Sequence, residues 1–439
     1  MGRINPENEA SFNKYSATIE RVYENYSKNS QIGVHSTKTS IALKSKSTPF
    51  RSFGYQPREE FESSVSTSWL SEWVAGNIQI NFVDNPSNGN DFHMDGSYFG
   101  IAIGNWIAAI DQVDRWWGPG WDGSLILSNN ARPVPAVSLT RISPNPFKNK
   151  YLNWIGPWTL NTFMGQLDNN EGEREGTDAL LFGIRVETSP FNWQWLDIGL
   201  SRTAQWAGKG RPHSLETFRM LLFGEDNRVP GTNVTKETEP GNQLAGIDYR
   251  AKLGNWNIAQ YAQLIGEDEE GFLPDANMLM GGIETWGTIE SLNSTWRAYF
   301  EWADTRAGYL NAEKRPNNAY NIAYQHSIYR EGYRRYDQSI GHSIDGDSIM
   351  RSIGYFLTTA NGNLFGIKYR NYSINRDGSG SHSVSSDALE GDSLEFFGEF
   401  KLNNTTYLKF GLNYSNELNL RTDVSNSDIG SFLSYNKAL

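Results

Sequence analysis

Apolar and polar residues alternate along many segments of this chain, and a period of two predicts β-strands with one apolar face. In LEFFGEFKL (394–402), Phe396 and Phe400 fall on one face, and Glu395 and Glu399 fall on the other. The same pattern recurs in GIDYRAKL (246–253), WRAYFEW (296–302), LFGIKYR (364–370) and YLKFGLNYS (407–415). One predicted face is apolar and aromatic, and the other carries charges of both signs.

Two architectures fit such strands: a soluble sandwich, whose charged face meets water, and a membrane barrel, whose charged face lines a lumen. Large aromatic residues recur on the apolar face, and they make up 13% of the chain while hydrophobic residues reach only 38%. Several predicted strands exceed the usual length of about five or six residues. Because no stretch has the roughly 18 to 20 apolar residues of a membrane helix, we predict a β-barrel.

The predicted connections alternate between short turns and long loops, as in outer-membrane barrels with periplasmic turns and long outer loops. Residues 320–329 resemble a further strand, which would make the strand count odd. Treating 303–347 as one loop restores an even number. We therefore predict an all-β, transmembrane, antiparallel outer-membrane barrel of about 18 strands over residues 31–439. The predicted long loops are 45–58, 84–91, 115–133, 168–178, 203–241, 266–277, 303–347, 375–392 and 416–427.

The N-terminal segment has a helical rather than a two-residue period. Asn5 can cap a helix over residues 5–28, with Pro6 in its first turn. Phe12, Tyr15, Ile19, Val22 and Tyr26 then form one apolar seam. Residues 1–30 are predicted to be a short periplasmic helical element. The start, MGRINPENEA, has no apolar signal region, so we expect a secretory signal to have been removed; the alternative is a cytoplasmic start.

Composition and missing motifs exclude several function classes. A net charge of −11 disfavours nucleic acid as a partner. The chain has no cysteine, and its six histidines lack metal-site spacing. GEDEEG (266–271) lacks the spacing of a calcium-binding EF-hand loop. No nucleophile elbow or phosphate-binding loop is present. We therefore expect no cofactor, no metal and no enzymatic activity.

The predicted outer loops combine tryptophan with charged and amide side chains, a mixture that suits sugars. Aromatic faces pack on pyranose rings, and arginine can grip an acidic sugar through two hydrogen bonds. Ordinary loop packing gives the same composition, and the tryptophans of RWWGPGWDG (115–123) could either plug the barrel or face a glycan. The candidate glycan-binding residues are Arg115, Trp116, Trp117, Trp121, Asp122, Trp206, Arg211, Glu267, Asp268, Asp304 and Arg306.

Five segments of the chain occur in the same order as in a known protein family. RWWGPGWDGSLI (115–126), QWAGKGRP (205–212), EPGNQLAGIDY (239–249), IGEDEEGFLPDANMLMGGIE (265–284) and ADTR (303–306) resemble the Wzi-like capsule assembly family. The resemblance covers the chain from about residue 55 to its end. It implies an outer-membrane barrel with a periplasmic helical element. It also implies a non-enzymatic lectin that helps attach capsular polysaccharide to the Gram-negative surface.

Three functions follow from these expectations. The favoured one is a plugged, monomeric barrel whose partners are capsular polysaccharide and outer-membrane lipid. A porin or solute channel would instead show rings of one charge sign and conduct ions. A surface polysaccharide hydrolase would need two facing carboxylates, and no such pair stands out in the sequence.

Overall fold

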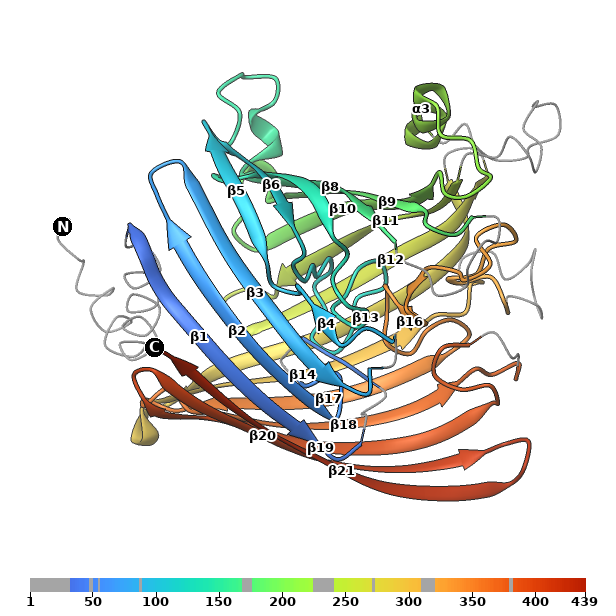
Figure 1. The fold of residues 1–439 in the computed structure, drawn as a ribbon. Coiled ribbons are helices and arrows are strands. Elements are labelled where there is room, and N and C mark those ends of the chain that lie inside the picture. The colour runs from blue at the N-terminus through green and yellow to red at the C-terminus, as the bar shows by residue number, and fades with distance from the viewer. Residues whose placement is uncertain are drawn as a thin grey trace.

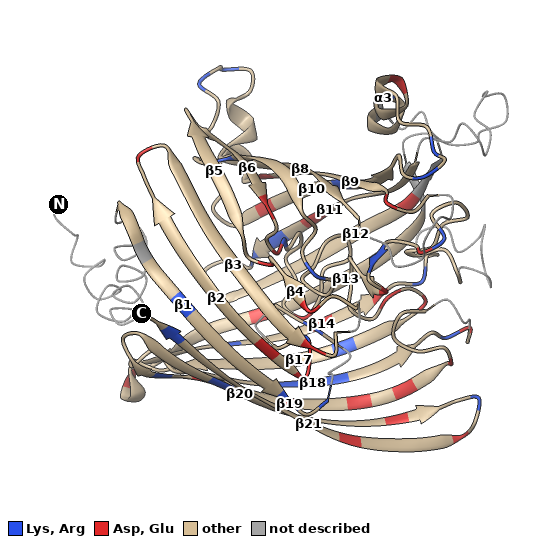
Figure 2. Cartoon of the chain, viewed as in Figure 1, with Lys and Arg blue, Asp and Glu red and all other residues tan. Residues whose placement is uncertain are grey.

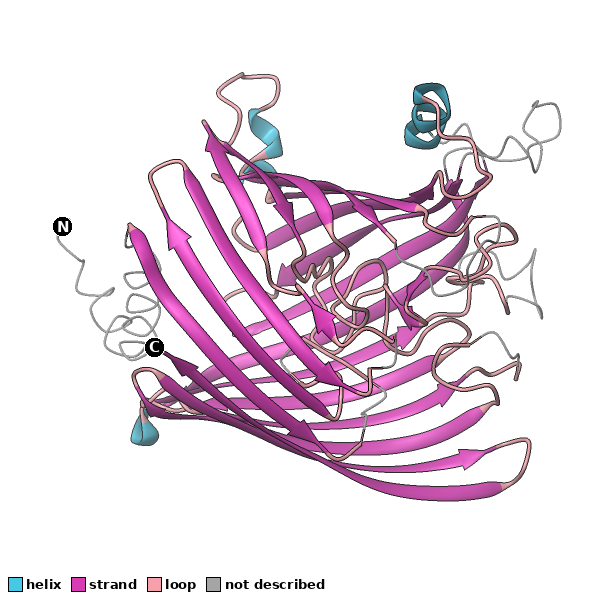
Figure 3. Cartoon of the chain, viewed as in Figure 1, coloured by secondary structure: helices cyan, strands magenta, loops and turns pink. Residues whose placement is uncertain are grey.

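The described strands form one closed antiparallel barrel that surrounds several of its own loops (Figures 1 and 3). The computed structural model describes residues 32–46, 50–53, 56–86, 89–167, 176–223, 241–270, 273–308, 320–378 and 382–439. The helix expected over residues 5–28 and the domain boundary at residue 30 lie outside them. Among the described residues, no helix is long and apolar enough to cross a membrane.

Strands make up most of the described chain, and its helical elements are short. The strands of the first half are β1 (Gly33–Lys44), β2 (Phe61–Leu70), β3 (Val74–Asp84), β4 (Phe92–His93), β5 (Tyr98–Ile103), β6 (Trp106–Asp111), β7 (Ala136–Arg141), β8 (Trp158–Gln166), β9 (Leu180–Thr188) and β10 (Leu196–Trp206). Those of the second half are β11 (Gly241–Lys252), β12 (Ile258–Glu270), β13 (Leu273–Ile289), β14 (Ser294–Asp304), β15 (Arg334–Arg335), β16 (Gln338–Ser339), β17 (Ile349–Thr358), β18 (Leu364–Ile374), β19 (Leu389–Asn403), β20 (Thr406–Asn419) and β21 (Val424–Ala438). The helical elements are the 3-10 turns η1 (Asn153–Ile155), η2 (Pro190–Asn192) and η3 (Glu290–Leu292), and the helix α3 (Leu215–Phe223).

The described residues build a barrel wall of 18 strands, as predicted. The main sheet contains 19 strands, but the two-residue β4 and the longer β5 both pair with β3 and share one place in the wall. β1 closes the barrel by pairing with β21 over seven residues of register, from Lys38 opposite Ala438 to Lys44 opposite Phe432. The described residues of the 303–347 region, which are 303–308 and 320–347, hold no wall strand beyond the end of β14, as expected for a loop.

Two predicted long loops are wrong, because the strands beside them continue. The hairpin of β12 and β13 pairs Glu267 with Ala276 and Glu270 with Leu273, inside the predicted loop 266–277. The hairpin of β20 and β21 remains paired up to Asn419 and Val424, inside the predicted loop 416–427. Strand pairing requires only backbone donors and acceptors, so acidic and polar side chains do not end a strand that extends beyond the apolar band.

The alternation of side chains matches the prediction. Ile353 and Leu412 on the outward face are 55% and 54% exposed, whereas Glu395, which points inward, is 2% exposed. Figure 2 shows charged positions along the strands of the barrel and around the loops inside it. Inward charges pair with one another: Arg185 and Asp248 are joined by two hydrogen bonds of 2.6 and 2.9 Å. The lumen is thus lined by ion pairs of both signs.

Candidate functional site

The loop between β6 and β7, residues 112–135, folds into the barrel, and we call it the plug loop. Leu125 and Ile126 at its centre have no exposed surface. A second loop packs on it from the chain between β14 and β17: the Tyr324 hydroxyl donates to the Leu125 carbonyl at 2.5 Å, and the Tyr333 hydroxyl to the Ile126 carbonyl at 2.9 Å. Figure 3 shows these loops inside the strand wall. The barrel therefore has its own apolar core within the lumen.

The inward carboxylate of Glu301 on β14 holds the turn of the plug loop. It accepts three successive backbone N–H groups, from Trp121 at 2.7 Å, Asp122 at 3.1 Å and Gly123 at 2.9 Å. The Tyr261 hydroxyl donates a fourth hydrogen bond at 2.9 Å. A buried carboxylate with four donors is fully satisfied, and hydrogen bonds to a charged group are among the strongest in proteins.

The turn held by Glu301 has no room for side chains at its glycines. A Cβ on Gly123 would lie 1.9 Å from His342 Nε2, and a Cβ on Gly120 would lie 2.2 Å from the Gly123 carbonyl. The glycines of GPGWDG therefore allow the backbone to approach both the second loop and itself.

A second wall strand grips the same turn through an ion-pair chain. Arg370 on β18 binds Asp122 through two hydrogen bonds of 2.7 and 2.8 Å, and its remaining amino group donates to Glu395 at 3.0 Å. Gln56 donates to the other oxygen of Glu395. All four side chains are buried. The pKa of Asp122 is about 2: burial alone would raise the pKa, but the Arg370 guanidinium outweighs it.

The amide of Gln263 on β12 fixes the plug loop further along. Its Nε2 donates to the Trp117 carbonyl at 2.7 Å, and its Oε1 accepts the Leu125 N–H at 2.7 Å. The fully buried Gln263 side chain thus satisfies backbone groups on both limbs of the folded plug loop, where no backbone partner is needed.

We expect the plug to loosen at mildly acidic pH because of His342. Burial lowers the pKa of His342 to about 4, although the nearby Asp122 carboxylate acts to raise it and Arg370 adds to the lowering. The neutral ring therefore contributes stability that is present above its unfolded pKa of about 6.5. That stability, up to about 3 kcal/mol, is lost as the pH falls from 6.5 towards 4. Tryptophan near-ultraviolet circular dichroism at pH 7 and pH 4 measures the loss of packing.

His342→Asn is the matched control for this pH effect. Its amide oxygen can replace His342 Nδ1, which accepts the Ile344 N–H at 3.3 Å, but the group does not titrate. The spectrum of this variant should change less between pH 7 and pH 4. An equal change in both proteins would contradict the assignment to His342.

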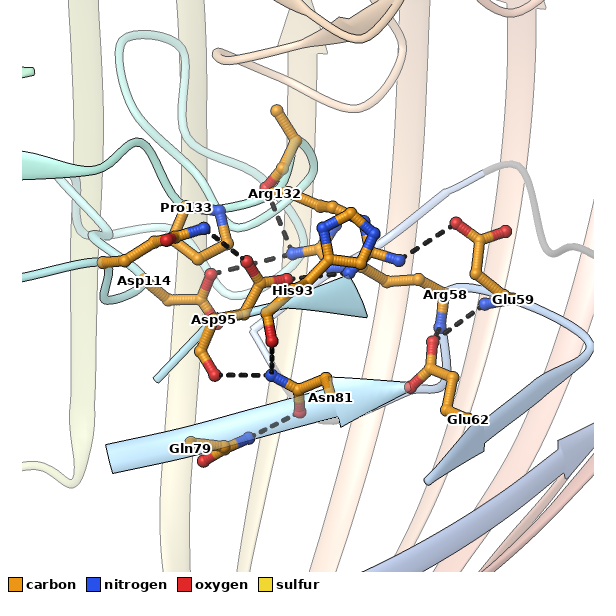
Figure 4. Close-up of polar contacts among 12 residues, drawn as sticks. Arg58, Glu59, Glu62, Gln79, Asn81, His93, Asp95, Asp114, Arg132 and Pro133 are labelled. Atoms are coloured by element: carbon orange, nitrogen blue, oxygen red, sulfur yellow. Dashed lines mark hydrogen bonds and ion pairs between the residues drawn. The ribbon is translucent and has the colours of Figure 1, made fainter. Parts of the chain in front are cut away.

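An ionic cluster joins two further loops to the plug loop (Figure 4). Arg132 of the plug loop binds Asp95 at 2.7 Å and Glu59 at 3.1 Å. Arg58 donates to three successive plug-loop carbonyls, those of residues 129 to 131, at 2.9, 2.5 and 3.1 Å. The loop between β1 and β2 and the loop between β4 and β5 are thereby bound to the plug loop.

The three plug-loop tryptophans are not equivalent. Trp117 is 5% exposed and packs edge-on against Phe163 with ring centroids 5.5 Å apart. The half-buried Trp121 donates from its indole to Glu284 at 3.0 Å and lies 4.6 Å from the Arg297 guanidinium. The indole of Trp116 donates back to the Gly120 carbonyl at 3.2 Å. All three rings therefore have partners within the barrel.

Comparison with known proteins places this plugged barrel in a family. The model of the family "Capsule assembly protein Wzi" matches residues 33–434. The chain belongs to the Wzi capsule assembly family. A 55.8 kDa Klebsiella pneumoniae protein from the cps region is 37% identical over 247 residues, which cover 55% of this chain and 45% of that protein. The chain therefore aligns with less than half of that relative's length.

A solved structure of the family has the same fold. Escherichia coli Wzi, described as an outer membrane protein involved in group 1 capsule assembly and as a carbohydrate-binding β-barrel, aligns with a TM-score of 0.81. The identity is 26%, and the alignment covers 96% of this chain and 88% of that one. This Wzi-family chain is accordingly an outer-membrane β-barrel, as predicted from its sequence.

The structure divides the predicted glycan-binding residues into three groups. The side chains of Arg115, Trp117, Asp122, Arg211, Glu267 and Asp304 are buried, and Trp116, Trp121, Trp206 and Arg306 are partly exposed. The side chain of Asp268 lies outside the described residues. Of the two alternatives given for the 115–123 tryptophans, these contacts favour a plug, because Glu301, Gln263 and Arg370 hold the loop inside the lumen. The glycan-binding role of all eleven residues stays a prediction.

Two predicted residues outside the plug loop have clear partners. Glu267 accepts the Tyr324 backbone N–H at 2.7 Å and so also supports the inner loops. Trp206 lies at the end of β10, where its indole donates to Thr217 of α3 at 3.3 Å and its ring packs on Phe218. The predicted residues thus serve at least two separate regions.

Sequence reasoning missed the residues that hold the plug, namely Gln263, Glu301 and Arg370. The alternation in WRAYFEW (296–302) predicts Glu301 on the polar face of its strand, and its 2% exposure confirms this placement. Its partner could not be inferred, because Trp121 lies 180 residues away in the chain. Among the described residues, no group of three or more histidine, aspartate or glutamate side chains is arranged to hold a metal ion.

Proposed function

We propose that this protein binds capsular polysaccharide at its long-loop end and retains the polymer on the cell surface without cleaving it. The observation that supports this most strongly is the plug, which fills the lumen with buried apolar and ion-paired side chains. A filled lumen favours a role at the surface over transport. Family membership and the carbohydrate-binding description of Escherichia coli Wzi support the same function.

Arg306 is the best-placed predicted residue for contact with the polymer. It follows β14 at the long-loop end, which faces outwards in bacterial outer-membrane barrels. Asp304 fixes its guanidinium through hydrogen bonds of 2.9 and 2.5 Å, and the Arg306 side chain remains 36% exposed. A guanidinium held in place this way can donate its remaining N–H groups to sugar hydroxyls or carboxylates.

We expect Arg306→Ala to weaken binding of purified capsule fragments about tenfold, because one charge-assisted hydrogen bond contributes roughly 1.5 to 3 kcal/mol. Isothermal titration with the refolded barrel measures the affinity. Arg421→Ala is the matched control, since Arg421 is a 74% exposed arginine in the loop between β20 and β21. Equal affinity of the Arg306 variant and the unmodified protein would rule out this contact.

The two rival functions have direct tests. Steady single-channel conductance from the unmodified protein in planar bilayers would support a channel and contradict the plugged barrel. Capsule fragments that become shorter during incubation with the protein would support a hydrolase. We expect neither result.

A further inference from the structure

The connection between β7 and β8, residues 142–157, is the longest described connection at the short-turn end of the barrel. It contains η1 and projects beyond the strands β5 and β6 (Figure 1). It packs on η2 in the next connection at this end: a Cβ on Gly156 would lie 2.0 Å from the Ser189 carbonyl. The two connections therefore form one unit.

This unit displays a continuous row of exposed aromatic rings, which we call the aromatic platform. Trp154, Phe191, Trp193 and Trp195 follow one another with ring centroids 5.9, 4.9 and 5.3 Å apart. Their exposed fractions are 52%, 54%, 42% and 47%, and the neighbouring Tyr151 is 72% exposed. So much aromatic surface in contact with water is unfavourable, which indicates that another apolar phase covers it.

The backbone holds part of the platform in an uncommon conformation. Phe191 and Asn192 have φ angles of 55° and 57°, in the left-handed region. That region is disfavoured for a bulky side chain such as Phe191. Strained backbone of this kind persists where the surrounding structure fixes it, and it is concentrated at functional sites.

The β7–β8 connection, which supplies one half of the platform, is locally cationic in an acidic protein. Residues 136–158 contain Arg141, Lys148 and Lys150 and no acidic residue, although the chain as a whole carries a charge of −11. Among the described residues, none of these three cations has an ion-pair partner within 4.0 Å. The Arg141 guanidinium lies 3.8 Å from the Trp158 ring centroid, and Lys150 Nζ lies 4.9 Å from that of Tyr151.

The outward face of the wall continues into the platform. The rings of Trp106 and Trp158 at the ends of β6 and β8 are 6.5 Å apart, and Phe147 stacks on Trp158 at 4.9 Å. Tryptophan and tyrosine side chains are characteristic of the membrane–water interface, and lysines close to it attract anionic headgroups.

We propose that the aromatic platform is a binding site for anionic phospholipid in the periplasmic leaflet. The rings lie at the level of the headgroups and upper acyl chains. Lys148 and Lys150 contact the lipid phosphate, while Arg141 stays fixed against Trp158. This site lies at the opposite end from the proposed polysaccharide contact, so the two proposals stand or fall separately.

Native mass spectrometry of the full chain, exposed to equal amounts of phosphatidylglycerol and phosphatidylethanolamine, tests the proposal. The unmodified protein should retain phosphatidylglycerol preferentially. Lys148→Gln/Lys150→Gln should reduce that preference by about fivefold for each lysine removed. Trp154→Ser should reduce the retention of both lipids, because the ring contacts the chains as well as the headgroup.

The matched control is Trp73→Ser/Lys437→Gln, which removes an exposed aromatic and an exposed lysine from the same end of the barrel but outside the platform. This variant should keep the preference. Loss of the same size in the control would overturn the proposal by showing that bulk charge attracts the lipid. An unchanged preference in the double lysine variant would overturn it as well, and heat-modifiable migration on gels confirms that each variant is folded.

Discussion

Glu301→Ala should open the barrel to ions. The substitution removes the acceptor of three consecutive plug-loop N–H groups and of the Tyr261 hydroxyl. Leaving a buried donor unsatisfied costs roughly 1 to 3 kcal/mol, so four donors destabilise the closed plug by at least about 4 kcal/mol. Water then solvates the freed turn, and the plug loop leaves its position. We expect clear single-channel currents in planar bilayers from a protein that is closed when unmodified.

Two variants make this result specific. Glu301→Gln keeps one carbonyl acceptor and should give smaller or briefer currents than Glu301→Ala. Glu399→Ala removes another carboxylate, which pairs with Lys409 at 3.0 Å and is 30% exposed, and it should leave the barrel closed. Absence of current from Glu301→Ala in a correctly folded barrel would show that Gln263 and Arg370 hold the plug without Glu301.

Arg370→Met should strongly destabilise the barrel from within the lumen. It leaves Asp122 and Glu395, both at most 3% exposed, without their shared cation. Breaking a buried ion pair by removing one partner costs roughly 3 to 5 kcal/mol, because the remaining charge is uncompensated. Urea unfolding of the barrel in detergent, followed by tryptophan fluorescence, measures the change in the free energy of unfolding.

A double variant identifies the source of that loss. Asp122→Asn/Arg370→Met removes the stranded charge on the plug loop and should recover part of the stability. Arg421→Met breaks an ion pair whose arginine is 74% exposed, and it should cost less than about 1 kcal/mol. If Arg370→Met and Arg421→Met had equal effects, the Asp122–Arg370–Glu395 chain would not stabilise the barrel.

The sequence predicts the wall of this protein far better than its interior. A period of two specifies which side of a strand faces lipid, so the inward position of Glu395 and the outward position of Phe396 follow from neighbouring residues alone. The requirement for an even number of strands then decides whether a doubtful segment such as 320–329 is counted as a strand or as part of a loop. These are local properties, and each can be read within a window of about ten residues.

The plug depends on contacts between residues far apart in the chain. The composition of RWWGPGWDG predicts a bent aromatic loop, but the same composition suits a sugar-binding rim. The contacts that decide between the two are made by Glu301, Gln263 and Arg370, which are 138 to 248 residues away from their partners in the plug loop. The hairpin over 266–277 shows that local composition can also mislead. Its acidic residues indicate a loop, although its backbone pairs as a normal β-hairpin.

The anchoring of the plug loop also constrains the order in which the protein can assemble. The loop is synthesised between β6 and β7, but its anchors lie on β12, β14 and β18. Until those strands join the wall, the apolar side chains of Leu125 and Ile126 have no cavity to enter. Contacts between such distant segments form slowly, and exposed apolar chain is prone to aggregate meanwhile. Insertion of the plug loop into the lumen must therefore be a late step of biogenesis, and a nascent barrel passes through an unplugged stage.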